Sequence, residues 1–268
     1  MSTLDDSLNK AINSMSGTSI SRIDKYNKIV EWWQNQTKNT KADYECLLDN
    51  FRILFSYNSS SIEGSKVDYH TTREVFDSGS VTGFSGSLRE LFEVQNQKFC
   101  YNILLDSLVS KRPLDEKFIL KLHRVLLYGT YDETRWVKGE RPGTYKVNDY
   151  CIGSNDEGSY PEDVHDDIQN LLDEINSEDG DVLVKASYFH LAFEAIHPFA
   201  DGNGRLGRVL LNYFLMLNNY PPIVIFSEDK STYYLALEIW DRTDKLDGFK
   251  ELIIDETIKT WKRKIPNK

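Results

Sequence analysis

The stretch His197-Pro198-Phe199-Ala200-Asp201-Gly202-Asn203-Gly204-Arg205-Leu206-Gly207-Arg208 concentrates most of the chemistry of this chain. Histidine can accept a proton near neutral pH, and a single carboxylate can hold Mg2+ that already carries phosphates. The Gly-Asn-Gly step lets backbone N–H groups approach an anion at a helix start, where the helix dipole favours negative charge. Arginine offers phosphate a planar fork of donors. Together these residue types suit a site that handles a nucleoside triphosphate.

Helices flank this run on both sides. Before it, apolar residues fill most positions from 188 to 196, which predicts a buried helix. That helix cannot continue far past His197, because a proline follows and disfavours helical geometry in the residue before it. After the run, an apolar stripe over 206–217 predicts a second helix. The glycines of the run therefore lie at a helix N-terminus, and its two arginines, three residues apart, share one face.

Chance can produce parts of this run but not the whole. An isolated Asp-Gly-Asn-Gly is only a turn in about nine cases of ten, and a histidine on an apolar helix is usually a satisfied core residue. The complete run fixes roughly eight positions, so its chance occurrence is on the order of one in ten billion windows. A functional site is therefore the better interpretation.

The run resembles the signature His-x-Phe-x-Asp/Glu-Gly-Asn-Gly-Arg-x-x-Arg of the Fic (Fido) family at every fixed position. The resemblance implies a mostly α fold, a Fic-type helical bundle with a small β-hairpin flap. It implies an enzyme, a protein adenylyltransferase (nucleotidyltransferase), that uses ATP and Mg2+ to attach AMP to a Ser, Thr or Tyr hydroxyl of a target protein. Kinase-like Doc relatives carry lysine where this chain has Gly204, so the glycine favours AMP transfer over phosphate transfer.

The resemblance also implies a role for each residue of the run. His197 is expected to be the catalytic general base on the target hydroxyl, and Asp201 the Mg2+ ligand. Attack at the α-phosphorus leaves pyrophosphate, so positioning and charge neutralisation supply most of the catalysis. Phosphate binding is expected from the anion-hole residues and two guanidiniums: Gly202, Asn203, Gly204, Arg205 on the β-phosphate and Arg208 on the γ-phosphate.

A second segment, Ser59-Ser60-Ser61-Ile62-Glu63-Gly64, resembles the inhibitory motif of the family, Ser/Thr-x-x-x-Glu-Gly/Asn, at Ser59, Glu63 and Gly64. Without that context it is a serine-rich helix end closed by a glycine cap, and the two interpretations are compatible. Its place before the core resembles the Fic class with an N-terminal inhibitory helix. The resemblance implies that Glu63 borders the nucleotide and pairs with Arg208. It would then remove the γ-phosphate partner and leave ATP misaligned.

The segment 143–153 resembles the flap of the family, which docks a target protein by strand addition at residues 145–153. Independently, strand formers recur along it at Tyr145, Val147, Tyr150 and Ile152. Without the resemblance, a surface hairpin with no task is an equal alternative. The resemblance places further nucleotide contacts at Ile152, Gly153, Ser154, Asn155, Tyr233 and Tyr234. The family often has asparagine seven residues after that tyrosine pair; this chain has Asp241 there, which we leave unassigned.

Charge and composition narrow the class of protein. Lysine and arginine total 32 against 42 acidic residues, so the net charge of −10 argues against general nucleic-acid binding. No stretch approaches the roughly 20 apolar residues of a membrane helix, and the first residues lack a secretory signal. Three distant cysteines point to a reducing compartment. We expect a cytoplasmic protein that binds neither nucleic acid nor membrane. Relatives often dimerise, so a homodimer stays open.

We expect a single globular unit with four parts. They are an N-terminal helical extension (1–40), an inhibitory helix region packed on the core (41–85), the Fic catalytic core (86–245) and a C-terminal helix (246–268). Capping boxes at 71–74 and 87–90 predict the starts of helices that run to about 77 and 110. Further helices are predicted at 23–33, 44–55, 114–127, 162–176, 183–196, 204–218, 229–243 and 248–263.

Other interpretations of the chain stay open. One is the reverse reaction, in which a de-AMPylating hydrolase uses Glu63 to orient a water. Another is a catalytically vestigial nucleotide-binding regulatory module. Intact His197 and Asp201 weigh against the second, because binding alone needs no general base. A local basic cluster is either solvated loop charge or a docking rim: Arg135, Lys138, Arg141 and Lys146.

Overall fold

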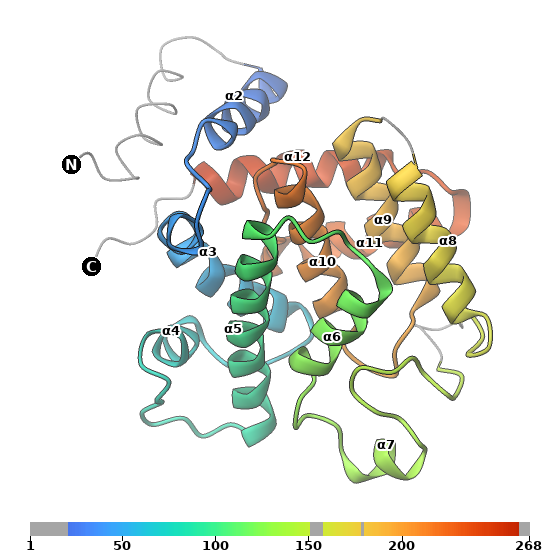
Figure 1. Cartoon of the computed structure of the whole chain (residues 1–268). Coiled ribbons are helices and arrows are strands. Elements are labelled where there is room, and N and C mark those ends of the chain that lie inside the picture. Colours follow the sequence, from blue (N-terminus) through green and yellow to red (C-terminus); the bar gives the residue numbers. More distant parts are fainter. Residues whose placement is uncertain (1–20, 151–157, 178–179, 263–268) are drawn as a thin grey trace.

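The computed structural model describes residues 21–150, 158–177 and 180–262. Within these ranges the regular elements are all helices, which confirms the mostly α part of the predicted fold (Figure 1). They are α2 (Arg22–Gln34), α3 (Lys41–Ile62), α4 (Tyr69–Asp77), α5 (Leu88–Val109), α6 (Glu116–Leu126), α7 (Glu133–Val137), α8 (Val164–Ser177), α9 (Val182–Ile196), α10 (Asn203–Leu217), the short 3-10 turn η1 (Ser227–Asp229), α11 (Lys230–Thr243) and α12 (Asp247–Lys262).

Helix α10 lies in the middle of the bundle (Figure 1). It packs against α9, α5, α6 and α3, and residues 205–216 are all buried. This burial follows from the apolar stripe over 206–217, which leaves little polar surface to face water. The N-terminus of α10, where the signature run begins, is therefore fixed by several neighbouring helices at once.

Aromatic residues pack α2 and α12 together at the other end of the molecule. The ring of Trp261 lies 5.2 Å from Trp32 and 5.5 Å from Trp33, and it stacks on Phe51 at 5.9 Å. All four side chains are buried. Large aromatic surfaces of this kind dominate core energetics. They attach α2 and α12 to α3, the helix whose C-terminal end reaches the candidate site.

The sequence predicted capping boxes at the starts of two helices, α4 and α5, and one of the two forms. The capping box predicted at Ser87 is present: its hydroxyl accepts from the Glu90 backbone, and the Glu90 carboxylate accepts from the Ser87 N–H at 3.0 Å. The box predicted at Thr71 is wrong. Helix α4 begins earlier because the Asp68 carboxylate accepts the Thr71 N–H at 2.7 Å. The Glu74 side chain contacts Thr82 instead of closing a box.

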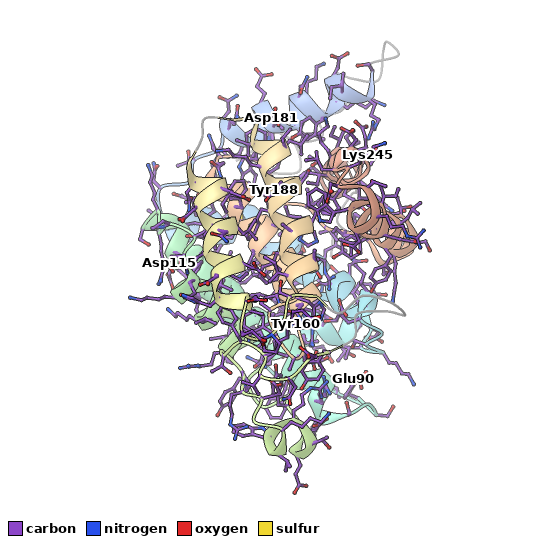
Figure 2. The ribbon with its side chains drawn as sticks, turned by 90° about the vertical axis from the view of Figure 1, so that its right-hand side faces the viewer. Glu90, Asp115, Tyr160, Asp181, Tyr188 and Lys245 are labelled. Carbon is purple, nitrogen blue, oxygen red and sulfur yellow. The ribbon has the colours of Figure 1, made fainter. Side chains whose placement is uncertain are left out.

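Helices α8 and α9 run side by side in opposite directions. Figure 2 shows Tyr160, just before α8, at one end of the pair and Asp181, the N-cap of α9, at the other. The C-terminal end of α9 therefore lies near Tyr160, where the Ser159 N–H donates to the carbonyl of Ile196 at 3.0 Å. None of the helices in the described residues has the length and hydropathy to cross a membrane.

Candidate active site

Two left-handed residues shape the turn between α9 and α10. His197 ends α9 with a φ of 50°, and Gly202 precedes α10 with a φ of 85°. A Cβ at Gly202 would also lie 2.5 Å from Cδ2 of Leu127, so both backbone and space require glycine there. A non-glycine residue with positive φ is strained, and such strain persists where surrounding structure enforces it. The candidate base is thus held in a fixed, unusual backbone conformation.

Asn203 holds this turn in shape from the inside. Its Oδ1 accepts the N–H of Phe199 at 2.9 Å, and its Nδ2 donates to the Phe199 carbonyl at 2.7 Å. Because the side chain is buried and used in this way, only the backbone of Asn203 is left for an anion hole. Gly202 supplies no side-chain cap to α10. The first N–H groups of α10 are therefore available to an anionic ligand.

Asp201 is surrounded by guanidiniums. Its Oδ1 accepts from Arg205 at 2.9 Å, and its Oδ2 lies 2.8 Å from Arg89 and 3.3 Å from Arg135. Glu93 joins the same network, at 2.9 Å from Arg205 and 3.1 Å from Arg89. Burial alone would raise the pKa of Asp201, but the three arginines lower it below its ordinary value. The carboxylate is therefore ionised and shared between several cations.

This environment decides what kind of metal site Asp201 can form. No group of three or more His, Cys, Asp or Glu side chains is placed to hold a metal among the described residues. A single buried carboxylate beside a phosphate cradle does fit Mg2+, which binds one or two carboxylates together with substrate phosphates and keeps several waters. Asp201 thus suits a metal that arrives with a nucleotide.

Arg208 is engaged by the end of α3. Its Nη2 donates to Oε1 of Glu63 at 2.7 Å and to the Ser59 carbonyl at 3.0 Å, while its Nε donates to the Ser59 hydroxyl at 3.0 Å. The Arg208 side chain is 2% exposed and that of Glu63 37%. Burial would raise the pKa of Glu63, but Arg208 lowers it. The structure therefore brings together the two residues that the resemblance paired.

Helix α3 is longer than its apolar spacing indicated and ends at the glycine cap that the serine-rich segment predicted, and this extension delivers the pair. It continues to Ile62, whereas the apolar spacing predicted an end near Phe55. Glu63 is its C-cap, and Gly64 follows with a φ of 88°. The Ser65 N–H bonds back to the Ser60 carbonyl at 3.1 Å, which is a Schellman closure. The segment is thus a glycine-capped helix end that also presents a carboxylate to Arg208.

His197 and Arg208 share one cavity of about 430 Å3. Burial, together with the charge of Lys146, lowers the pKa of His197 to about 4. The imidazole is therefore neutral at pH 7 and can accept a proton. The cavity is lined by Glu63, Glu194, Ala195, His197, Gly204, Arg208, Tyr233, Tyr234, Leu237, Glu238 and Asp241.

Glu194 is a buried acid in this cavity that sequence reasoning did not assign. Burial raises its pKa to about 8, so it is mostly protonated at pH 7. A Cβ at Gly207 would lie 2.3 Å from its Oε1, so the glycine of the signature run makes room for this side chain. The neighbouring His190 is buried, as expected for a core residue, and its Nε2 lies 3.0 Å from the Tyr233 hydroxyl.

His123 contacts both segments that border the site. The Gly143 N–H donates to its Nδ1 at 2.8 Å, and its Nε2 lies 3.0 Å from the carbonyl of Asp201. Its ring stacks on Phe199 at 3.7 Å. Burial lowers the pKa of His123 to about 4, so the ring is neutral. Since Nδ1 accepts, the proton must be on Nε2 and is donated to Asp201.

Glu140 organises the segment predicted as a hairpin. Its buried carboxylate accepts from the Val147 N–H at 3.2 Å, from Nδ2 of Asn148 at 2.7 Å and from the Tyr150 hydroxyl at 3.0 Å. Residues 143–150 form turns and bends, and no strand occurs in any described range. Residues 151–153 lie outside the described residues. The β-hairpin therefore remains a prediction.

The basic cluster of the sequence does not form one surface. Arg135 contacts Asp201 and Asp132, and Arg141 lies over the Trp136 ring at 4.0 Å. Lys146 is buried, and its Nζ has no hydrogen-bond partner among the described residues. Lys138 Nζ lies 6.0 Å from the centre of the Tyr150 ring. The four cations thus have different surroundings, so the structure favours neither a docking rim nor simple solvated charge for the group as a whole.

The remaining sequence-predicted residues divide into two groups. Tyr233 and Tyr234 both line the cavity; Tyr233 is buried, and Tyr234 is 42% exposed. Ile152, Gly153, Ser154 and Asn155 lie outside the described residues. Of the residues that sequence reasoning missed, His123 and Glu194 had a usable signal: each is a polar residue inside an apolar helical pattern. Glu140 had no comparable signal in its loop.

Known proteins share sequence similarity with this chain. Residues 113–215 match the model of the Fic/DOC family. Protein adenylyltransferase fic-1 of Caenorhabditis elegans is 31% identical over 194 residues, which cover 70% of this chain and 36% of that protein. Protein adenylyltransferase Fic of Drosophila willistoni is 32% identical over 207 residues, 76% of this chain and 40% of that protein. The match thus spans less than half the length of these relatives.

Solved structures agree on the fold. A Fic domain containing signalling protein from Bacteroides thetaiotaomicron superposes with a TM-score of 0.77 at 27% identity, covering 90% of this chain and 94% of that chain. A fragment of Fic-1 from C. elegans gives a TM-score of 0.73 at 24% identity, covering 95% and 72% respectively. The second likeness concerns the fold alone.

Proposed function

The chain belongs to the Fic/DOC family, and from this premise we propose that it is a protein adenylyltransferase restrained by its own Glu63. It would transfer AMP from Mg2+-bound ATP to a Ser, Thr or Tyr hydroxyl of a target protein docked at 145–153. The curated relatives named above are protein adenylyltransferases. Homodimer formation and a cytoplasmic location remain predictions from the sequence.

The residues of the site can perform the steps of this transfer. Neutral His197 removes the proton from the target hydroxyl as its oxygen forms a bond to the α-phosphorus. The bond from the α-phosphorus to the β-bridging oxygen breaks, and pyrophosphate leaves. The N–H groups at the start of α10, with Arg205 and Arg208, stabilise the charge on the phosphates. Asp201 would hold Mg2+, which supplies further charge neutralisation to the triphosphate.

The single observation that carries the inhibitory part is the contact between Glu63 and Arg208 in the cavity that contains His197. An arginine that holds a carboxylate at 2.7 Å cannot place the same donor on a phosphate. The carboxylate also adds negative charge where the γ-phosphate should lie. A charge-assisted pair of this kind is typically worth about 1.5–3 kcal/mol, which corresponds to about ten- to a hundredfold in population.

The test is a transfer assay with labelled ATP and Mg2+ on the full chain, with mass spectrometry to detect an added AMP. Glu63→Gly should increase self-modification or target modification by about ten- to a hundredfold. Adding His197→Ala should abolish transfer while ATP affinity changes little. Glu238→Gln is the matched control, because this glutamate lines the same cavity but pairs with Arg242.

An inert Glu63→Gly protein that still binds ATP and Mg2+ would contradict the inhibitory role. It would favour removal of AMP instead, for which the position of Glu63 in the same cavity as His197 is the supporting observation. In that reaction a water oriented by Glu63 attacks the phosphorus of the modified residue. The bond to the target oxygen breaks, the hydroxyl regains a proton and AMP leaves. Incubation of AMP-modified protein with wild type and Glu63→Gly separates the two reactions.

A further inference from the structure

We propose that His123 is a positioning residue that holds the target-docking segment and the Mg2+-binding loop in a fixed relation to each other. The docking and metal roles of these two segments rest on the proposed function. His123 itself lies on α6 and touches no expected substrate atom. Its contribution is the link between Gly143, at the start of one segment, and Asp201, in the other.

The two ring nitrogens of His123 have separate tasks. Nδ1 accepts the N–H of Gly143 at 2.8 Å, and the Nε2–H donates to the backbone carbonyl of Asp201 at 3.0 Å. The imidazole is rigid and planar, so the distance between its two partners is set by the ring. A change in one contact therefore changes the position available to the other.

Glycine geometry supports both contacts. Gly143 has a φ of 85°, and a Cβ there would lie 2.7 Å from the Cβ of Arg124. Gly202 has the same φ, and its Cβ would lie 2.5 Å from Leu127. Arg124 and Leu127 both belong to the C-terminal end of α6. Each of the two segments thus lies on the end of one helix, at a glycine that lets the backbones approach closely.

Further contacts join the segments next to His123. The ring of Phe199 stacks on the His123 ring at 3.7 Å and lies 5.5 Å from the ring of Tyr145, which is tilted against it. The Lys146 N–H donates to the Pro198 carbonyl at 2.9 Å. His123 is fully buried, so water cannot replace either of its hydrogen bonds without opening the core. This arrangement makes His123 the polar centre of a packed junction.

The two nitrogens can be tested separately with a matched pair of variants in the Glu63→Gly background. His123→Asn places its amide near the position of Nδ1, so Oδ1 can still accept from Gly143 while the bond to Asp201 is lost. His123→Gln reaches the position of Nε2, so it can donate to Asp201 but loses Gly143. Two readouts are measured: the Mg2+ concentration for half-maximal binding of a non-hydrolysable ATP analogue, and hydrogen exchange at residues 143–147.

We expect the two variants to have opposite effects. His123→Asn should raise the half-maximal Mg2+ concentration several-fold with exchange unchanged. His123→Gln should leave Mg2+ dependence unchanged and accelerate exchange at the Gly143 amide about tenfold, the size of effect that one lost hydrogen bond gives. If both variants change both readouts equally, or if neither changes any, the positioning role is wrong.

Two controls keep the test decisive. If neither variant folds, the 15N chemical shifts of His123 in the unaltered protein still report whether Nδ1 is unprotonated and Nε2 protonated. The opposite tautomer, or an imidazolium, overturns the proposal. If the parent does not bind the Mg2+–nucleotide at all, the proposed function fails, while exchange at Gly143 still tests the structural link.

Discussion

Arg205 and Arg208 lie three residues apart on α10, yet their surroundings are built differently. Arg205 belongs to a shared network, in which Asp201 contacts three guanidiniums and Glu93 contacts two of them. Arg208 is committed to one helix end, through Glu63 and Ser59. On one side every ion has a substitute partner; on the other, Glu63 is the one carboxylate that contacts the guanidinium among the described residues, beside the uncharged oxygens of Ser59.

The two surroundings should therefore respond differently to a ligand. In the shared network, a phosphate or Mg2+ can replace one contact while the other contacts remain, so the response is gradual. At Arg208 a phosphate can take the Nη2 donor only when Glu63 has left, so we expect a response closer to a switch. Buried pairs with a dedicated partner are also the ones whose disruption costs most, because they leave an uncompensated charge.

We expect the strongest change from replacing Arg208, the arginine that is held by Glu63. Arg208→Met in the Glu63→Gly background should reduce AMP transfer about a hundredfold, since one preorganised donor to transition-state charge is typically worth that much. In the Arg208→Met protein, Glu63→Gly should no longer activate, because the restraint acts through the arginine. Initial transfer rates of wild type, both single variants and the double variant give the coupling. Equal activation by Glu63→Gly with and without Arg208 would contradict this view.

The next effect concerns Glu194, the second acid near Arg208. Its pKa is raised to about 8, so the folded protein binds a proton there that the unfolded chain loses near pH 4.5. Stability must then fall as pH rises from about 4.5 to 8, by up to about 1.4 kcal/mol per pH unit from this group. Glu194→Gln should remove that contribution, as measured by urea unfolding at pH 6, 7 and 8.

The control for this measurement is Glu238→Gln, since Glu238 lines the same cavity but is exposed. Glu256 also has a pKa raised to about 8. Its own contribution to the pH dependence of stability therefore persists in every variant, so the slope for Glu194→Gln is reduced and not abolished. Parallel pH dependences for wild type and Glu194→Gln would show that Glu194 is ionised in the folded state. Arg208 would then have two anionic partners, and the contrast with Arg205 would be lost.

The smallest effect is expected on the shared side. Arg89→Met should lower the Mg2+ concentration for half-maximal nucleotide binding about two- to fivefold, because a half-exposed guanidinium no longer competes for Asp201. The effect stays small since Arg205 and Arg135 remain. Arg22→Met is the control. Arg22 lies on α2 and pairs with Glu251 and Asp255 on α12, and it makes no ion pair with Asp201. A loss of binding above tenfold would make Arg89 a dedicated partner.

Most of the fold follows from apolar periodicity and capping chemistry. The stripe over 206–217 and the box at Ser87 correspond to α10 and α5 because burial and local hydrogen bonds favour the same boundaries. At Thr71 two local interactions competed, and the Asp68 cap formed instead. The apolar spacing placed the end of α3 too early because Ser59 and Ser60 are buried by tertiary contacts that polarity alone does not indicate. The glycine cap predicted at Gly64 is confirmed.

The candidate site was predictable only where its residues are close in sequence. The His197–Arg208 run contains its own geometry, since a turn and one helix start place its groups together. The contacts of Asp201 with Arg89 and of His123 with Gly143 join distant segments. No local pattern encodes them, because they depend on how α5 and α6 pack. The pairing of Glu63 with Arg208 was expected from family resemblance alone.

The position of Glu63 at the very end of α3 has a kinetic consequence. Release of the Arg208 Nη2 donor requires Glu63 to move away, and its partly exposed side chain lies on the last, glycine-capped turn. Motions of partly exposed side chains and of chain ends take picoseconds to microseconds. Enzyme turnover is typically far slower, on the order of milliseconds to seconds. The restraint would therefore re-equilibrate many times within each catalytic cycle and lower the competent fraction by a constant factor. Product formation should rise linearly from the first turnover, without a lag.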